Sequence, residues 1–217
     1  MLFGVGMYAV FAFLPEFLQT APSAGYGFGA SITHSGLILL PATITMFLFG
    51  ILSGRLSKRF GAKLVLVAGA SISIITFVLL TFAHSQQWEI LIAMTIEGVG
   101  FGLAFAAMSN LIVQAVPPSQ TGVASGMNAN IRTIGGAAGA AVMSSVVTAG
   151  AHNGVPKLSG YTHGFAMLTI ATIIAAIAAT FVPKTIGSRK RSAGNVEFRH
   201  AELGMVAGGT LVGDESE

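Results

Sequence analysis

The sequence predicts an all-α membrane protein with six transmembrane helices, and two observations carry that prediction. Hydrophobic residues make up 53% of the 217 residues and charged residues only 9%, against roughly 25% charged in a typical soluble domain. Between Lys63 and Arg132 the only formal charges are Glu89 and Glu97. A soluble domain would need polar groups to cover its outside. Helices are expected because a spanning backbone must satisfy its own hydrogen bonds, and the alternating polarity of barrel strands is missing.

Dividing the chain at clusters of Pro, Gly and charged residues gives six apolar stretches, each near the roughly 20 residues that cross a ~30 Å hydrocarbon core. We expect the first to end before Pro22, the second to end in a basic cluster, and the third to be free of charge after Lys63. The fourth lies between Glu89 and Pro117, the fifth is rich in glycine, and the sixth ends at Pro183. The expected spans are 1–20, 36–56, 62–83, 89–114, 122–149 and 162–182, so residues 1–183 form the transmembrane domain.

Basic residues in the connections predict the orientation of the spans. Nine of the eleven Lys and Arg residues fall on one side, between the second and third spans or after the sixth, and only Lys157 falls on the other. Because Lys and Arg are retained on the inner side of a membrane, we expect a plasma-membrane protein with both termini in the cytoplasm. Residues 184–217 hold ten of the nineteen charged side chains and are predicted to form a disordered cytoplasmic tail.

Three stretches resemble a known family. The connection between the second and third spans resembles the cytoplasmic loop motif of the major facilitator superfamily, although Lys58 stands where that motif has Asp. Residues 13–19 with 36–41, and residues 116–126 with 132–136, look like the C-terminal half of the fourteen-span drug/proton antiporters. The motif residues of the connection are Gly54, Arg55, Arg59, Gly61 and Lys63.

The resemblance implies a fold and a function. The six helices would form two inverted three-helix repeats, packed as one half of a transporter bundle. The whole protein would be a secondary transporter that exports drugs or other small molecules in exchange for protons, and a missing N-terminal half bundle would supply the other wall of its cavity. Because Met1 opens directly into an apolar span, we expect this chain to be part of something longer. The expected partners are the lipid bilayer, a small-molecule substrate and protons, with no nucleic acid and no cofactor.

Three charges lie inside the expected spans, where an ionisable group costs about 2.5 to 3.5 kcal/mol on insertion scales and should face a cavity or a partner. Glu97 lies eight residues beyond Glu89, about 12 Å along a helix, and is either a proton carrier or a carboxyl that reaches water. Arg132 either faces the translocation path, receives Glu97 as a partner, or extends towards the cytoplasmic phosphates. Glu16, near the outer end of its span, is a weaker proton-carrier candidate. Arg132 shares a helix face with Ser125, Asn128, Gly135 and Gly139.

Two pairs of glycines have the four-residue spacing that lets transmembrane helices approach closely. Gly98 and Gly102 lie in the fourth span, and Gly135 and Gly139 lie in the fifth. We interpret both pairs as helix-packing positions.

Two other classes of function remain open. The chain could be a non-transporting structural remnant of a truncated transporter gene. An intramembrane hydrolase is the weaker alternative, because Ser71 is followed by Ile72 instead of the glycine that a rhomboid-like site would need. We therefore expect no enzyme activity. The histidines have no metal-site spacing, and no metal site is expected.

Overall fold

The computed structural model describes residues 1–151 and 155–182, which fold into six long helices. All six are long and apolar enough to cross a membrane, which confirms the predicted all-α membrane fold. The expected tail, residues 184–217, lies outside the described residues. The helices are α1 (Leu2–Gln19), α2 (Ile32–Phe60), α3 (Ala62–Phe82), α4 (Gln87–Ala115), α5 (Thr121–Thr148) and α6 (Leu158–Thr180), with short 3-10 turns η1 (Pro22–Ala24) and η2 (Pro118–Gln120).

Two helices extend beyond the apolar stretches that mark them in the sequence. α2 begins at Ile32 instead of 36, because the Ser31 hydroxyl accepts a hydrogen bond from the His34 N–H at 3.2 Å and caps the helix. It continues through the basic cluster to Phe60, four residues past the expected end. α6 likewise begins at Leu158 instead of 162. Hydrophobicity marks only the part of a helix suited to lipid, whereas its hydrogen bonding continues to the cap.

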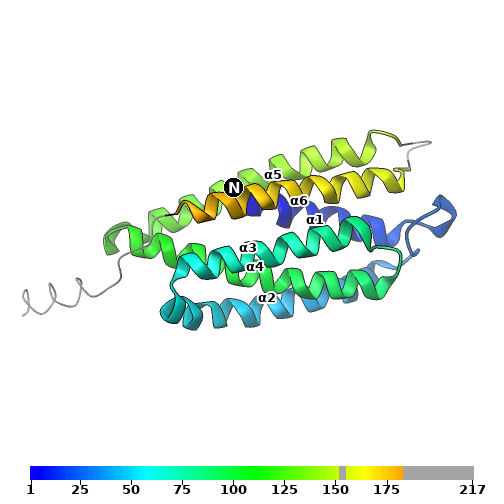
Figure 1. Ribbon diagram of the computed structural model, residues 1–217. Coiled ribbons are helices and arrows are strands. Elements are labelled where there is room, and N and C mark those ends of the chain that lie inside the picture. The colour runs from blue at the N-terminus through cyan, green and yellow to red at the C-terminus, as the bar shows by residue number, and fades with distance from the viewer. Residues whose placement is uncertain (152–154, 183–217) are drawn as a thin grey trace, which may run out of the picture. The chain divides into compact units, whose positions relative to one another are not determined.

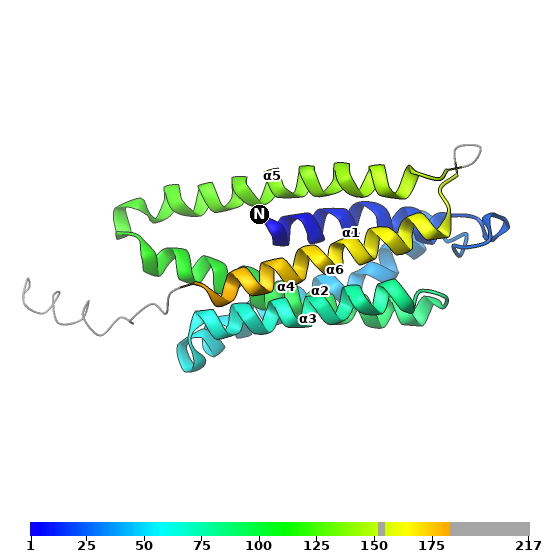
Figure 2. The ribbon, with the colours of Figure 1, turned by 45° about the horizontal axis from the view of Figure 1, so that its top comes forward.

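The packing of the helices repeats itself. α1 packs mainly against α5 and α6, α4 packs mainly against α2 and α3, and α3 packs against α6. Exchanging α1 with α4, α2 with α5 and α3 with α6 leaves this set of neighbours unchanged, as two inverted three-helix repeats require. Both views place α5 beside α1 and α2 beside α4 (Figures 1 and 2).

α4 and α2 differ greatly in burial. In the most apolar 18-residue window of each helix, 67% of the α4 residues are buried inside the protein but only 17% of the α2 residues. The exposed side chains of α2 include Leu37, Ile44 and Phe47. A continuous apolar surface of this kind suits contact with lipid tails or with another membrane-embedded bundle.

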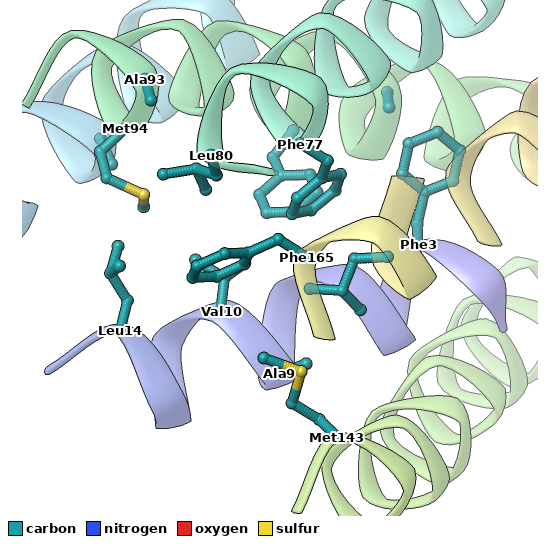
Figure 3. Close-up of a cluster of buried hydrophobic side chains, with 14 of the residues drawn as sticks. Phe3, Ala9, Val10, Leu14, Phe77, Leu80, Ala93, Met94, Met143 and Phe165 are labelled. Carbon is teal, nitrogen blue, oxygen red and sulfur yellow. The ribbon is translucent and has the colours of Figure 1, made fainter. Parts of the chain in front are cut away.

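The apolar core joins helices from both repeats. Five side chains of this core have an exposed fraction of 0%: Val10 and Leu14 of α1, Phe77 and Leu80 of α3, and Phe165 of α6. Figure 3 shows them converging with Met94 of α4 and Met143 of α5. Lipid tails are as apolar as these side chains, so the cluster stabilises the bundle mainly through close packing and van der Waals contact.

Candidate substrate and proton path

Glu97 is the only charged side chain that is buried among the described residues, and its exposed fraction is 0%. It lies in α4 on the side that faces α3, where Ser73 and Thr76 are its polar neighbours. The Thr76 hydroxyl donates to the Ile72 carbonyl at 3.3 Å. Within the described chain, neither carboxyl oxygen of Glu97 makes a hydrogen bond of ordinary geometry, and neither does the Ser73 hydroxyl, but the Ser73 and Thr76 hydroxyls lie close enough to interact with the carboxyl. The structure therefore places a carboxyl beside hydroxyl groups, with no counterion among residues 1–151 and 155–182.

The two helices around Glu97 approach each other closely. A Cβ atom added to Gly69 of α3 would lie 2.7 Å from the carbonyl oxygen of Gly100, and one added to Gly100 of α4 would lie 2.5 Å from the Ser73 hydroxyl oxygen. At Gly69 the close atoms belong to the backbone, so only glycine fits there, whereas a Cβ atom at Gly100 would displace the Ser73 hydroxyl and press on the Gly69 carbonyl oxygen at 3.0 Å. This α3–α4 contact was not predicted from the sequence, because Gly69 and Gly100 belong to different helices and share no spacing motif.

Arg132 lies in α5, and its side chain reaches α4. The guanidinium carbon is 4.9 Å from the ring centroid of Phe105. Gly4 of α1 leaves room for the backbone of α5 at this residue, since a Cβ atom at Gly4 would overlap the Arg132 carbonyl oxygen and would lie 3.1 Å from the Arg132 Cγ atom. Arg132 is partly exposed, but its Nε atom is buried and has no hydrogen-bond partner in the described residues.

The structure does not bring Glu97 and Arg132 together, so the pairing considered from the sequence is wrong. Glu97 points to α3, whereas Arg132 lies over Phe105, eight residues further along α4. Eight residues turn a helix by about 80° at 3.6 residues per turn. The two charged groups thus occupy different sides of α4.

The expected polar face of α5 is divided in two. Ser125 is exposed and Asn128 is half-buried, whereas Gly135 and Gly139 are buried. A Cβ atom at Gly139 would lie 2.6 Å from the Cα atom of Val5, so this part of α5 packs directly on the backbone of α1. The part of this face that is not packed against α1 therefore runs from Ser125 to Arg132.

Glu16 is exposed near the end of α1. Its backbone carbonyl accepts hydrogen bonds from the Thr20 N–H at 3.0 Å and from the Thr20 hydroxyl at 2.9 Å. Its carboxyl interacts electrostatically with Tyr161 of α6, a residue at the same end of the bundle.

The glycines of α4 lie against the backbone of α2. A Cβ atom at Gly102 would lie 2.5 Å from the Met46 carbonyl oxygen, and one at Gly98 would overlap the Thr45 hydroxyl and the Ala42 carbonyl.

Hydroxyl groups join α2 and α4 at both ends of this contact. The Thr45 hydroxyl lies 3.0 Å from the Thr95 carbonyl, and Ser53 donates to Leu103 at 3.1 Å. The hydroxyl contacts were not predicted from the sequence, in which Ser and Thr are common throughout the spans.

The two motif glycines of the α2–α3 connection have different surroundings. Gly61 forms the turn with φ +89°, a conformation that only glycine adopts readily. Gly54 lies within α2, and an added Cβ atom would contact nothing within 4 Å. Arg55 and Arg59 are exposed, Lys63 is half-buried, and the Arg59 guanidinium lies 5.3 Å from the ring centroid of Phe60.

An aromatic cluster closes the end of the bundle opposite the α2–α3 connection, and this cluster was not predicted from the sequence. The ring of Phe17 lies 5.6 Å from that of Tyr26 and 5.2 Å from that of Tyr161. The Tyr26 hydroxyl donates to the Pro156 carbonyl at 2.7 Å, which ties the α1–α2 loop to the α5–α6 loop. No sequence spacing connects residues 130 positions apart, so only the fold shows this contact.

Curated proteins with similar sequences are named as resistance proteins. The chain is 31% identical over 149 residues to a tetracycline resistance determinant of Streptomyces rimosus, which covers 67% of this chain and 41% of that protein. It is 29% identical over 144 residues to the multidrug resistance protein Stp of Mycobacterium tuberculosis, covering 66% of this chain and 26% of that protein. The chain thus spans less than half the length of these relatives.

Solved transporters share the fold. The nucleoside transporter NupG matches with a TM-score of 0.69 at 20% identity, covering 82% of this chain and 45% of NupG. The inward-open xylose transporter XylE of Escherichia coli matches with a TM-score of 0.66 at 18% identity, covering 92% of this chain and 53% of XylE. The family profile described as Major Facilitator Superfamily matches residues 1–211. With its six membrane-spanning helices and repeated packing, this chain belongs to the major facilitator superfamily.

Proposed function

We propose that this chain is the C-terminal half of a secondary transporter that exports drugs or other small molecules in exchange for protons. The relatives named for tetracycline and multidrug resistance support export of such compounds. The basic α2–α3 connection supports a plasma-membrane orientation with both termini in the cytoplasm. An N-terminal half bundle would pack against the exposed faces and supply the second wall of the cavity.

Glu97 is the residue that we assign to proton coupling, and its full burial beside the Ser73 and Thr76 hydroxyls carries the assignment. A carboxylate without a counterion is costly inside a membrane, whereas a neutral acid costs far less. The Ser73 and Thr76 hydroxyls can accept a hydrogen bond from the acid or donate one to the carboxylate. Gain or loss of one proton at Glu97 would therefore change the close α3–α4 contact, which links protonation to helix packing.

The test uses the full-length transporter in liposomes that contain a pH-sensitive dye. An imposed tetracycline gradient should drive proton movement, and Glu97→Gln should reduce that movement by about ten-fold or more. Tetracycline binding should persist in this variant. Glu89→Gln is the matched control, because Glu89 is a capping carboxylate on the same helix that accepts backbone hydrogen bonds at 2.8 and 2.9 Å.

Each result has a definite meaning. Unchanged proton movement in Glu97→Gln would remove that residue from the mechanism. Equal losses in the two variants would show that the effect of Glu97 is not specific to its buried site. Absence of tetracycline-driven proton movement in the wild-type protein would refute proton-coupled tetracycline transport itself.

A further inference from the structure

We propose that Arg132, oriented by Phe105, binds the acidic group of a transported substrate, so that the substrates include organic anions. This inference rests on the proposed transport function and names a substrate class for it. The ligand that the geometry calls for is a carboxylate or another anionic oxygen on an otherwise apolar molecule.

An aromatic platform fixes the guanidinium of Arg132. The group lies 4.9 Å from the centroid of the Phe105 ring, a distance at which a cation is attracted by the face of the ring. Phe101 stacks on Phe105 at 5.4 Å and 16°, and Phe3 of α1 meets Phe105 edge-on at 6.2 Å and 71°. Phe105 is thus held from two helices. The guanidinium that it supports is oriented before any ligand arrives.

Among the described residues, the guanidinium of Arg132 has an unused hydrogen-bond donor. Its Nε atom is buried without a hydrogen-bond partner, and no carboxylate of the described chain pairs with the guanidinium. A positive charge within a membrane span is costly unless it pairs with a counterion, a backbone carbonyl or water. Because a planar guanidinium can bind a carboxylate through two parallel N–H donors, an acidic ligand would satisfy the unused donors.

The surroundings of Arg132 leave a route for such a ligand. Arg132 is partly exposed where α5, α4 and the start of α1 meet. On the cytoplasmic side of Arg132, according to the proposed orientation, α5 presents the half-buried Asn128 and the exposed Ser125. An acidic group could approach along these polar side chains without crossing the packed Gly135–Gly139 segment.

The test compares two xanthene dyes of similar size and opposite charge, with binding to the full-length transporter in nanodiscs measured by fluorescence polarisation. Fluorescein is the anionic probe, and tetramethylrhodamine methyl ester is the cationic probe. Arg132→Gln should weaken fluorescein binding by about ten-fold or more and change rhodamine binding by less than about two-fold. Arg132→Lys, which keeps the charge but not the planar stacking, should fall between the wild type and Arg132→Gln.

Arg59→Gln is the matched control, because Arg59 also lies over a phenylalanine but at the exposed end of α2. It should leave the ratio of the two dye affinities unchanged. Retained rhodamine binding shows that Arg132→Gln is folded. If a carboxylate elsewhere in the transporter neutralises Arg132, Arg132→Gln would leave that carboxylate unpaired and should strengthen rhodamine binding by well over two-fold, which would overturn the proposal.

Failure of this inference is distinguishable from failure of the proposed function. No binding of fluorescein to the wild type would overturn the anion site, even if tetracycline still drove proton movement. Absence of tetracycline-driven proton movement in the wild-type protein would refute proton-coupled tetracycline transport, even if fluorescein bound through Arg132.

Discussion

Substitution of Gly102 by Ala should separate helices α2 and α4, and the structure gives the size of the effect. The added Cβ atom would lie 2.5 Å from the Met46 carbonyl oxygen and 3.0 Å from the Gly50 nitrogen, both of which are backbone atoms. An ordinary contact begins at 3.4 Å, so α2 must move by about 0.9 Å at this point. No side-chain rotation can relieve the overlap.

The displacement also affects the hydroxyl contacts between the helices. The Thr45–Thr95 and Ser53–Leu103 distances of 3.0 and 3.1 Å would lengthen beyond normal hydrogen bonds. Each such bond contributes about 0.6 kcal/mol in a membrane protein, and overpacking costs about 1 to 3 kcal/mol. The higher helix propensity of Ala offsets up to about 1 kcal/mol. We expect Gly102→Ala to lower the free energy of unfolding by about 1 to 3 kcal/mol.

The assay is unfolding of the purified protein in mixed micelles, followed by circular dichroism as the fraction of sodium dodecyl sulfate increases. Gly54→Ala is the matched control, because an added Cβ atom there meets nothing within 4 Å; it should be neutral or stabilising by up to about 1 kcal/mol. Equal unfolding free energies for the two variants would refute the argument that α2 and α4 need glycine at their contact.

Three further predictions concern the connections between the helices. Gly61→Ala should destabilise the protein by about 1 to 3 kcal/mol in the same unfolding assay, because φ is +89° at the α2–α3 turn; an unchanged free energy would contradict the strain. Tyr26→Phe should cost about 1 kcal/mol, since it removes the 2.7 Å hydrogen bond to Pro156, and equal stability would show that this bond contributes nothing. The chain contains no cysteine, so Lys58→Cys and Ser85→Cys can each report topology. A membrane-impermeant maleimide added to intact cells should label Ser85→Cys and not Lys58→Cys, and the reverse pattern would invert the proposed orientation.

The membrane fold could be predicted from the sequence because a helix in contact with lipid must be long and uncharged. The scarcity of charged residues between Lys63 and Arg132 shows this directly. The sequence could not predict where α2 begins, since the Ser31 cap lies among polar residues outside the apolar stretch. Nor could it predict the neighbours of Glu97. Helical spacing indicates which residues share a face, but which helix packs against that face depends on tertiary contacts.

The contrast between α4 and α2 has a consequence for how each helix accepts sequence change. Protein surrounds the central part of α4, so a library of random replacements should be strongly depleted at its buried positions, including replacements of one apolar residue by another. The side of α2 turned away from α4 is exposed in the described part of the chain, and a fluid solvent accepts side chains of many shapes. Its outer positions should tolerate exchange among Leu, Ile, Val and Phe while rejecting Lys or Asp, and where a partner bundle covers them that tolerance should disappear.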